Sequence, residues 1–284
     1  MVLRLGLKPA TVYTRLLFTV RDPDVAMEQL VAIGFTAFAI EAHALTAWPA
    51  DEADVAAITA ALGQPPIERQ ELAHAEVYAD VIPAGAWQVA PGCWVVSGDA
   101  ALPLKLDHPE AARAVIRMPT GGGFGDGQHP ATGLACGLLA DVPLGGKRVL
   151  DLGCGTGLLG VLAWRLGASV VDFSDVDLDS IRHTQACCAA NGLVADIYQS
   201  DLLAGIPERT YDVLIANLYG EFLVTLFGDT RLKRLIPIGQ VVLSGISDGK
   251  RPAVEAALAA AGFRLDRRQT DDGWWGLLAS RSPE

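Results

Sequence analysis

The sequence Val149-Leu150-Asp151-Leu152-Gly153-Cys154-Gly155-Thr156-Gly157 joins an apolar strand to a glycine-rich turn, and a helical pattern follows over residues 158–166. Glycine accepts backbone conformations and close contacts that side chains forbid, so such a turn lets the backbone approach a nucleoside-containing cofactor. We therefore take Gly153, Gly155 and Gly157 as cofactor-binding candidates. The pattern Gly155-x-Gly157-x-x-Gly160 also satisfies the dinucleotide fingerprint, so the turn alone permits either a nicotinamide dinucleotide or S-adenosylmethionine.

Carboxylates at the ends of the predicted strands separate these two cofactors; they are Asp151, Asp175, Asp177 and Asp201. In an open parallel sheet the carboxyl ends of the strands form the ligand crevice, so these side chains should gather around the cofactor. A pyrophosphate would be repelled there, whereas the sulfonium and ammonium groups of S-adenosylmethionine would be attracted. Asp175 suits the ribose hydroxyls of either cofactor, so Asp151 and Asp201 favour S-adenosylmethionine. The nicotinamide cofactor is the alternative.

Composition restricts the class of protein. A chain of 284 residues that is 51% hydrophobic can fold as one large or two ordinary domains. Membrane-length apolar runs and a secretory signal are missing from the sequence, so we expect a cytoplasmic protein without membrane contact. Five cysteines without C-x-x-C spacing argue against a disulfide framework and against a metal site. The formal net charge of −11 disfavours nucleic acid and accommodates a basic protein substrate more easily.

Residues 1–82 are predicted to form a small domain of their own. Strand and helix patterns alternate in the order β-α-β-β-α-β, with strands expected in 12–20, 35–41, 44–48 and 67–82 and helices in 23–33 and 52–62. This order predicts a ferredoxin-like α/β sandwich, a fold that does not by itself indicate a function. Residues 83–117 are rich in Pro, Gly, Asp and Ala, and we interpret them as a linker.

Residues 118–284 form the second predicted domain. Strands are expected at 148–152, 170–173, 195–199, 212–216 and 240–244, with helical segments between most of them. Such alternation implies a parallel sheet covered by helices on both faces, an α/β Rossmann-like architecture. Two further strand-like runs, 262–265 and 274–278, are joined by the hairpin signal Asp271-Asp272-Gly273. An antiparallel hairpin at the end of a parallel sheet fits methyltransferases better than dehydrogenases.

The segment Gly121-Gly122-Gly123-Phe124-Gly125-Asp126-Gly127-Gln128-His129-Pro130-Ala131-Thr132 precedes the first strand of this domain and is predicted to be a flexible flap. We take Phe124 as a catalytic candidate that would lie against the adenine or cover the methionine end of the cofactor. Thr132, which opens a helix, would bind the cofactor carboxylate through its hydroxyl and nearby amides. His129 is interpreted as a structural residue beside Pro130, because the sequence provides no acid to partner it as a base.

The strand pattern 212–216 is followed by Asn217, whose side-chain amide offers both a donor and an acceptor at the expected site of transfer. We take Asn217 as a catalytic and cofactor-binding candidate that accepts a hydrogen bond from an incoming amine and directs its lone pair toward the methyl carbon. The alternative is that Asn217 is the N-cap of the following helix.

The flap 124–132, the turn 151–157, the strand end Ala216-Asn217-Leu218 and Leu243-Ser244-Gly245-Ile246 together resemble the ribosomal protein L11 methyltransferase family. The resemblance covers nearly the whole chain and implies a ferredoxin-like substrate-recognition domain, a linker and a class I S-adenosylmethionine-dependent methyltransferase domain. It implies methyl transfer to amino groups of ribosomal protein L11, which are lysine side chains, the N-terminal amine or both. We expect the protein to be a monomer.

The flap departs from the family pattern, which has Thr at the positions of Asp126 and Gln128 and a Thr pair at Ala131-Thr132. The departure concerns the substrate more than the cofactor. Three alternatives therefore stay open for the acceptor and the activity. The acceptor is a lysine of another protein, it is a small molecule or RNA, or the chain binds S-adenosylmethionine without catalysis.

Overall fold

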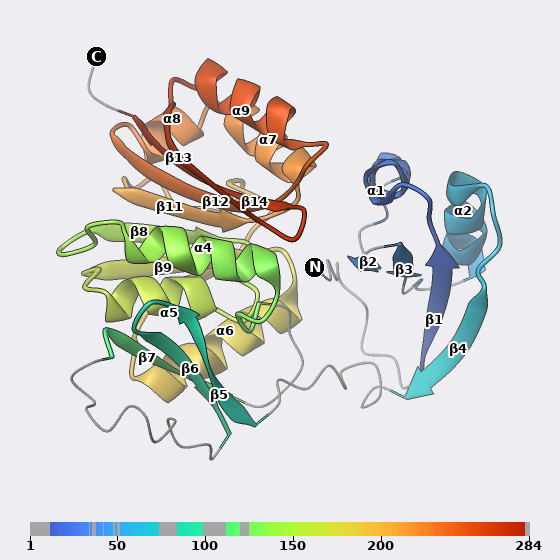
Figure 1. The fold of residues 1–284 in the computed structure, drawn as a ribbon, viewed down its shortest axis with the longest axis horizontal. Coiled ribbons are helices and arrows are strands. Elements are labelled where there is room, and N and C mark those ends of the chain that lie inside the picture. The colour runs from blue at the N-terminus through green and yellow to red at the C-terminus, as the bar shows by residue number, and fades with distance from the viewer. Residues whose placement is uncertain are drawn as a thin grey trace. The chain divides into compact units, whose positions relative to one another are not determined.

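The computed structural model describes residues 12–33, 35, 38–41, 43–47, 49, 52–73, 84–98, 112–119 and 125–281. The chain divides into two compact units, which are treated separately below (Figure 1). The smaller unit comprises residues 1–81 and 121–124, and the larger unit comprises residues 82–120 and 125–284. None of the helices among the described residues is long and apolar enough to cross a bilayer.

The smaller unit has the element order that the sequence predicts. Its elements are β1 (Val12–Thr19), α1 (Pro23–Ala32), β2 (Phe38–Glu41), β3 (Ala44–Ala47), α2 (Glu52–Leu62) and β4 (Glu68–Ala73). The sheet order is β2-β3-β1-β4, with every pair antiparallel. Alternate residues of β1, Leu16 and Phe18, are fully buried, and α1 packs against α2. The ferredoxin-like α/β sandwich is therefore confirmed.

The first helix of this unit begins where its capping residues place it. Asp22 accepts hydrogen bonds from the backbone amides of Asp24 at 3.0 Å and Val25 at 3.3 Å, and Pro23 occupies the first turn. A carboxylate cap satisfies amides that have no partner within the helix, and proline is tolerated at this position because it has no amide to satisfy.

A seven-stranded sheet forms the centre of the larger unit. Its strands are β8 (Arg148–Leu152), β9 (Val170–Asp175), β10 (Ile197–Gln199), β11 (Val213–Asn217), β12 (Gly239–Ser247), β13 (Arg264–Asp271) and β14 (Trp274–Arg281). Their order is β10-β9-β8-β11-β12-β14-β13. The first five strands pair in parallel, and β14 pairs antiparallel with both β12 and β13. The predicted parallel sheet with a terminal antiparallel hairpin is confirmed.

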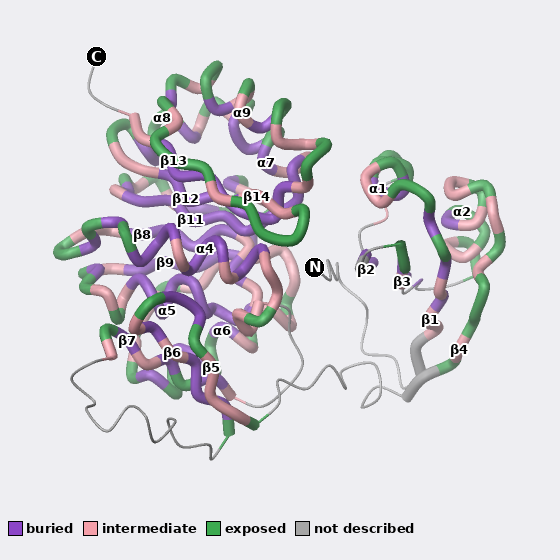
Figure 2. Tube along the Cα trace, viewed as in Figure 1, coloured by how far each residue is buried: buried purple, intermediate pink, exposed green. Residues whose placement is uncertain are grey.

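Helices cover both faces of this sheet and create two hydrophobic cores (Figure 2). The helices are α4 (Pro130–Ala140), α5 (Leu158–Arg165), α6 (Leu178–Asn191), α7 (Gly220–Gly228), α8 (Leu232–Leu235) and α9 (Arg251–Ala260). Along β11, Val213 and Ile215 join the core that contains α4, α5 and α6, whereas Leu214 and Ala216 join the core that contains α7, α8 and α9. Strand residues alternate between faces, so the apolar run of β11 serves both cores.

Residues 84–98 and 112–119, which we expected in a linker, form a three-stranded sheet. It consists of β5 (Gly85–Ala90), β6 (Cys93–Ser97) and β7 (Ala114–Met118); β5 contacts α4, and β7 contacts α5 and α6. Cys93, Val95 and Ile116 are fully buried in the same core as these three helices. Alternate residues of these short strands are buried in the core of the larger unit, so the strands belong to that unit. The sequence around them nevertheless has the composition of a connecting segment.

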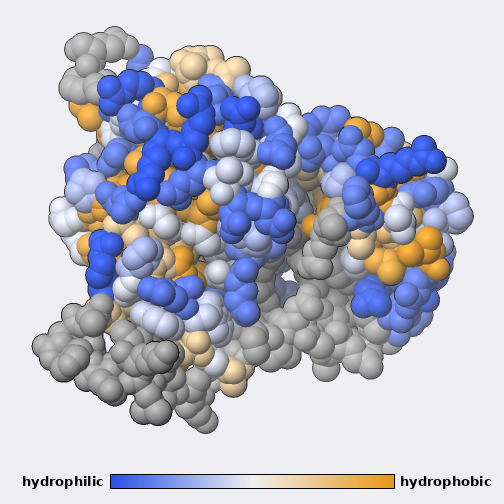
Figure 3. Space-filling model, viewed as in Figure 1, coloured by the Kyte–Doolittle hydropathy of each residue, from blue (hydrophilic) through white to orange (hydrophobic). Residues whose placement is uncertain are grey.

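Polar side chains predominate on the described surface of the larger unit in the face that Figure 3 shows, with small hydrophobic areas between them. Among the described residues, the exposed large hydrophobic ones are spread along the sequence rather than gathered in one segment: Val25, Ile33, Ile67, Leu178, Val194, Val224 and Ile238. Scattered exposed hydrophobic residues are normal for a folded domain. The five cysteines are free and buried.

Candidate functional site

The glycine turn lies between β8 and α5, where the sequence predicts it. Gly153, Gly155 and Gly157 have φ angles of +71°, +53° and +81°. A Cβ at Gly153 would lie 2.4 Å from the Leu218 side chain, and one at Gly157 would lie 3.1 Å from Thr184. Glycine is therefore favoured at these two positions by both conformation and contact.

Asp151 is the second-to-last residue of β8, two positions before Gly153, and is 1% exposed. Its Oδ2 accepts a hydrogen bond from the Gly160 amide at 2.8 Å, whereas its Oδ1 is buried and has no hydrogen-bond partner among the described residues. Burial is the main cause that raises the pKa of this carboxyl to about 8; the Gly160 amide counteracts it, and the negative charge of Asp175 adds to it. A buried carboxylate with one unpaired oxygen favours a cationic ligand, which would restore its ionised form.

Gly160, the third glycine of the dinucleotide pattern, has a packing role here. A Cβ at this position would lie 2.2 Å from the Phe173 ring and 3.0 Å from Asp151 Oδ2. The glycine thus allows α5 to approach the sheet closely and allows its amide to reach Asp151. The GxGxxG spacing follows from helix–strand packing, so it does not by itself indicate a pyrophosphate.

Asp175 ends β9 and faces the same turn. Its Oδ2 accepts a hydrogen bond from the Gly155 amide at 3.0 Å, and its Oδ1 accepts one from the Asp177 amide at 3.0 Å. Burial is the main cause of its raised pKa, which the two amides counteract. Asp175 is therefore bonded to the glycine turn itself, whereas Asp151, at the end of the adjacent strand, is bonded to Gly160 in α5, which follows the turn.

The other two aspartates of the predicted set have different surroundings. Asp177 is the N-cap of α6, and its Oδ2 accepts hydrogen bonds from the Ser180 amide at 3.0 Å and the Ser180 hydroxyl at 3.1 Å. Asp201 is exposed and opens a turn after β10, in which the Ala204 amide donates to its backbone oxygen at 2.9 Å. Asp177 thus has a capping role, and Asp201 lies at the surface beyond the edge strand of the sheet.

Asn217 and Thr132 are brought together from positions 85 residues apart. Asn217 Nδ2 donates to Thr132 Oγ1 at 3.2 Å, and the two residues are 8% and 1% exposed. Asn217 Oδ1 is buried without a hydrogen-bond partner among the described residues. The alternative that Asn217 caps the next helix is wrong, because α7 begins at Gly220 and its N-cap residue is Tyr219.

Ser244 is a residue of this region for which the sequence alone gave no role. It lies in β12 opposite Asn217 of β11 and is fully buried. Its hydroxyl donates to the Ala131 oxygen at 2.8 Å and lies 3.3 Å from the Trp275 oxygen. Ser244 thereby attaches the first turn of α4 to the sheet beside Asn217. The segment Leu243-Ser244-Gly245-Ile246 indicated the family but not this contact.

The described part of the flap, residues 125–132, is attached to the larger unit. Thr156 Oγ1 donates to the Gly125 oxygen at 2.8 Å, and Trp87 Nε1 donates to the Asp126 oxygen at 3.0 Å. The Asp126 carboxylate accepts hydrogen bonds from Gln128, from its amide at 2.9 Å and its side chain at 2.6 Å. Asp126 and Gln128, two of the residues that depart from the family pattern, therefore bond each other. Phe124 lies outside the described residues.

His129 is the N-cap of α4. Its Nδ1 accepts a hydrogen bond from the Ala131 amide at 3.2 Å, and its ring packs edge-on against Trp274 with centroids 5.2 Å apart. Burial lowers the pKa of His129 to about 4. A neutral, capping imidazole agrees with the structural interpretation of this residue.

The larger unit matches the family described as ribosomal protein L11 methyltransferase (PrmA) over residues 97–282. The chain belongs to the ribosomal protein L11 methyltransferase family. A ribosomal protein L11 methyltransferase of Parasynechococcus marenigrum is 34% identical over 240 residues, which cover 75% of this chain and 82% of that protein. One of Desulfosudis oleivorans is 35% identical over 187 residues, covering 64% of this chain and 61% of that relative. The chain thus spans less than two thirds of the Desulfosudis protein.

A solved structure has the same fold. The crystal structure of ribosomal protein L11 methylase from Lactobacillus delbrueckii subsp. bulgaricus superposes with a TM-score of 0.62 at 28% identity, covering 70% of this chain and all of that one. Family membership and fold identify the larger unit as an S-adenosylmethionine-dependent methyltransferase domain. The cationic cofactor fits the site, because Asp151 and Asp175 lie at the glycine turn and Asp151 has an unpaired buried oxygen.

Proposed function

We propose that this protein transfers methyl groups from S-adenosylmethionine to amino groups of ribosomal protein L11. The names of its relatives support the substrate. The observation that carries the chemistry is the Asn217 side chain, which Thr132 holds at the end of β11 while its buried Oδ1 has no hydrogen-bond partner among the described residues. A buried amide oxygen without a hydrogen-bond partner can accept a hydrogen bond from the N–H of an incoming amine.

The chain's own residues would hold the cofactor at the carboxyl end of the sheet. The turn 153–157 lines the site with backbone, Asp151 attracts positive charge, and Asp175 binds the ribose hydroxyls. Asp201 would face the adenine, and Thr132 and nearby amides at the start of α4 would bind the carboxylate. Phe124 is proposed to cover the cofactor. When bound, S-adenosylmethionine supplies an electrophilic methyl group on a sulfonium.

Asn217 acts by positioning rather than by attack. Its Oδ1 accepts a hydrogen bond from the acceptor amine and directs the nitrogen lone pair toward the methyl carbon. The amine must be neutral to react, so the site has to lower its protonation through desolvation or provide a route for its proton. Activity is therefore expected to rise with pH around neutrality. A flat pH profile of the chemical step would contradict this.

The smaller unit is proposed to recognise the protein substrate, and the reaction would take place in the cytoplasm. The family match begins at residue 97, so the ferredoxin-like unit lies outside it and provides a separate surface for binding. A net charge of −11 favours a basic partner. Deleting residues 1–82 should raise the KM for the protein substrate more than the KM for S-adenosylmethionine.

Two measurements test the proposed function. Titration calorimetry with S-adenosylmethionine and with NAD compares the cofactors, and tight NAD binding without S-adenosylmethionine binding would overturn the cofactor assignment. Incubation of the full chain with radiolabelled S-adenosylmethionine and purified ribosomal proteins tests the acceptor, and label on L11 amines is expected. Label on another protein, on RNA or on a small molecule would contradict the L11 assignment, and no label on any acceptor would leave a cofactor-binding protein.

A further inference from the structure

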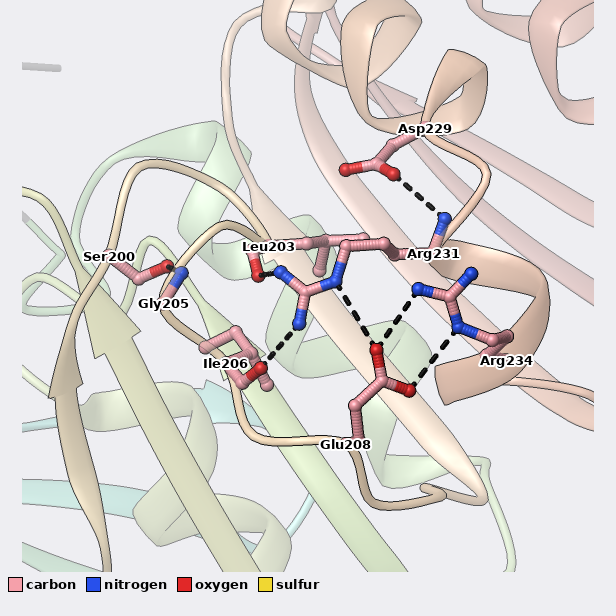
Figure 4. A network of polar contacts seen from close by, with 8 residues as sticks. All are labelled: Ser200, Leu203, Gly205, Ile206, Glu208, Asp229, Arg231 and Arg234. Atoms are coloured by element: carbon pink, nitrogen blue, oxygen red, sulfur yellow. Dashed lines mark hydrogen bonds and ion pairs between the residues drawn. The ribbon is translucent and has the colours of Figure 1, made fainter.

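Arg231, which directly precedes α8, bonds the backbone of the loop between β10 and β11 (Figure 4). Its guanidinium points into the loop and donates to the backbone oxygen of Leu203 and, at 2.6 Å, to that of Ile206. Its Nε also lies 3.7 Å from Glu208 Oε1. Asp229 accepts a hydrogen bond from the Arg231 amide at 2.8 Å and fixes the backbone from which the side chain extends. One side chain therefore connects three points of the loop.

The start of this loop has a backbone conformation that needs such support. Leu202 has a φ angle of +43°, in the left-handed region that non-glycine residues adopt only when their surroundings stabilise it. The Ser200 hydroxyl donates to the Leu202 oxygen at 2.7 Å and accepts from the Gly205 amide at 2.8 Å. Ser200 closes the loop on itself, and Arg231 attaches the closed loop to the junction of α7 and α8.

The same loop continues directly from the candidate cofactor site. The Ser200 amide donates to the Asp175 backbone oxygen at 2.8 Å, and the Asp175 side chain accepts the Gly155 amide of the glycine turn. Asp201, the residue proposed to face the adenine, lies between Ser200 and the strained Leu202. The position of Asp201 relative to the turn is therefore determined by a loop whose far end Arg231 holds.

We propose that Arg231 is a positioning residue for cofactor recognition, which holds residues 200–206 in the conformation that presents Asp201 to the adenine. The inference rests on the proposed function and deepens it, because it assigns part of the adenine specificity to a side chain that acts through the loop. A loop ordered before binding loses less conformational freedom when the cofactor arrives, and this raises affinity.

The choice of arginine follows from the geometry. A planar guanidinium donates to two carbonyl oxygens at once, which the single ammonium group of lysine does not reproduce. Arg234 provides a matched control, since its side chain bonds the Glu208 carboxylate at 3.0 Å and 3.3 Å, and in the described part of the chain the hydrogen bonds of this side chain go to that carboxylate. Both arginines share Glu208, but Arg231 is the one that donates to the loop backbone.

The experiment compares the full-length wild type with R231Q, R231K and R234Q by titration calorimetry with S-adenosylhomocysteine. The Kd is expected to rise about tenfold or more in R231Q and less in R231K, and to stay within about twofold of wild type in R234Q. In steady-state kinetics R231Q should raise the KM for S-adenosylmethionine, with kcat changed by less than about threefold. Equal affinities for R231Q and R234Q would overturn the inference, whereas a wild type that does not bind at all would overturn the proposed function.

A second ligand separates positioning from a general loss of structure. S-inosylhomocysteine differs from S-adenosylhomocysteine in the purine, so the ratio of the two affinities reports adenine recognition. R231Q should reduce this ratio toward one, and a parallel loss of both affinities would contradict a positioning role. If R231Q does not fold, amide hydrogen exchange of the wild type gives the test. Residues 201–206 should be protected without ligand, and rapid exchange that slows only with ligand would overturn the inference.

Discussion

Asn217 Nδ2 donates to Thr132 Oγ1 across 3.2 Å and so connects the end of β11 to the first turn of α4. The bond determines which atom of the amide remains available, because Nδ2 is engaged and Oδ1 is the acceptor without a partner among the described residues. An asparagine whose amide group could rotate would present a donor or an acceptor with equal ease. Thr132 therefore defines the chemical character of Asn217 toward an incoming amine.

Removing this hydroxyl should impair catalysis. We expect T132V to lower kcat/KM about tenfold to a hundredfold, since a buried amide that loses its acceptor costs about 1–3 kcal/mol. T132S keeps the hydroxyl and should stay within about threefold of wild type. Steady-state kinetics with a labelled methyl donor measures both variants. Equal activities of the valine and serine variants would refute the role of the hydroxyl.

The Asp151 carboxylate should link protein stability to pH. Its pKa is raised by burial to about 8 in the folded protein, above the value of an unfolded aspartate. The folded state therefore binds this proton more tightly than the unfolded state, and the resulting stability is lost as pH rises from about 4 to 8. D151N removes the titrating group, so the cofactor-free variant should lose less stability over this range than wild type. Denaturant unfolding at a series of pH values measures the difference.

The same substitution should weaken the cofactor. D151N retains the size of the side chain but removes the negative charge, so the Kd for S-adenosylmethionine is expected to rise about tenfold or more. D196N provides a control, because Asp196 is a largely exposed aspartate that bonds Arg209 and Tyr198 instead of the glycine turn. Calorimetric titration with S-adenosylmethionine measures the Kd of both variants. Equal Kd values for D151N and D196N would refute a role for the Asp151 charge.

His129 should influence stability rather than the chemical step. Its pKa is lowered to about 4 by burial, so the stability it contributes is present above the unfolded pKa and lost as pH falls from about 6.5 to 4. H129N retains a capping side chain and should preserve the rise of activity with pH near neutrality. H129A should lower the free energy of unfolding by about 1 kcal/mol. Loss of the alkaline rise in H129N would instead identify His129 as a base.

Two helical glycines should respond in opposite directions to alanine. G160A places a methyl group 2.2 Å from the Phe173 ring and should destabilise the protein by about 1–3 kcal/mol. G133A, in α4, meets no atom within 4 Å among the described residues and should stabilise the protein by up to about 1 kcal/mol. Thermal and denaturant unfolding compare the two, and destabilisation by G133A as large as by G160A would contradict the packing argument.

The strands of the larger unit could be predicted from sequence because buried parallel strands are continuous apolar runs with regular spacing. Their ends were less predictable. The run 195–199 has only the three residues of β10 in register with β9, while β13 and β14 extend beyond the predicted 262–265 and 274–278. The length of the hairpin depends on the pairing of β14 with β12, which includes a bulge between Leu243 and Ile246. The residues of the hairpin itself carry no sequence pattern that indicates this pairing.

Some residues of the candidate site could also be predicted from the sequence, and others could not. Asp151 and Asp175 could be predicted because they are the second-to-last and the last residue of adjacent buried strands, and topology brings adjacent strand ends together. The capping role of Asp177 follows from a local bond to Ser180 and was available from the sequence as well. Ser244 and Arg231 could not be predicted, because their partners lie 113 and 25 to 28 residues away in the chain.

The contact between Ser244 and the oxygen of Ala131 affects how the protein is made as well as how it binds. During synthesis α4 emerges 113 residues before the serine that attaches it to the sheet. The glycine turn with Asp151 and Asp175 is complete far earlier, since all of its groups lie within residues 151–177. The nascent chain thus contains the turn and its carboxylates long before Asn217 and Ser244, which lie at the proposed acceptor site, have been synthesised. Methyl transfer therefore requires the last third of the chain to be synthesised first.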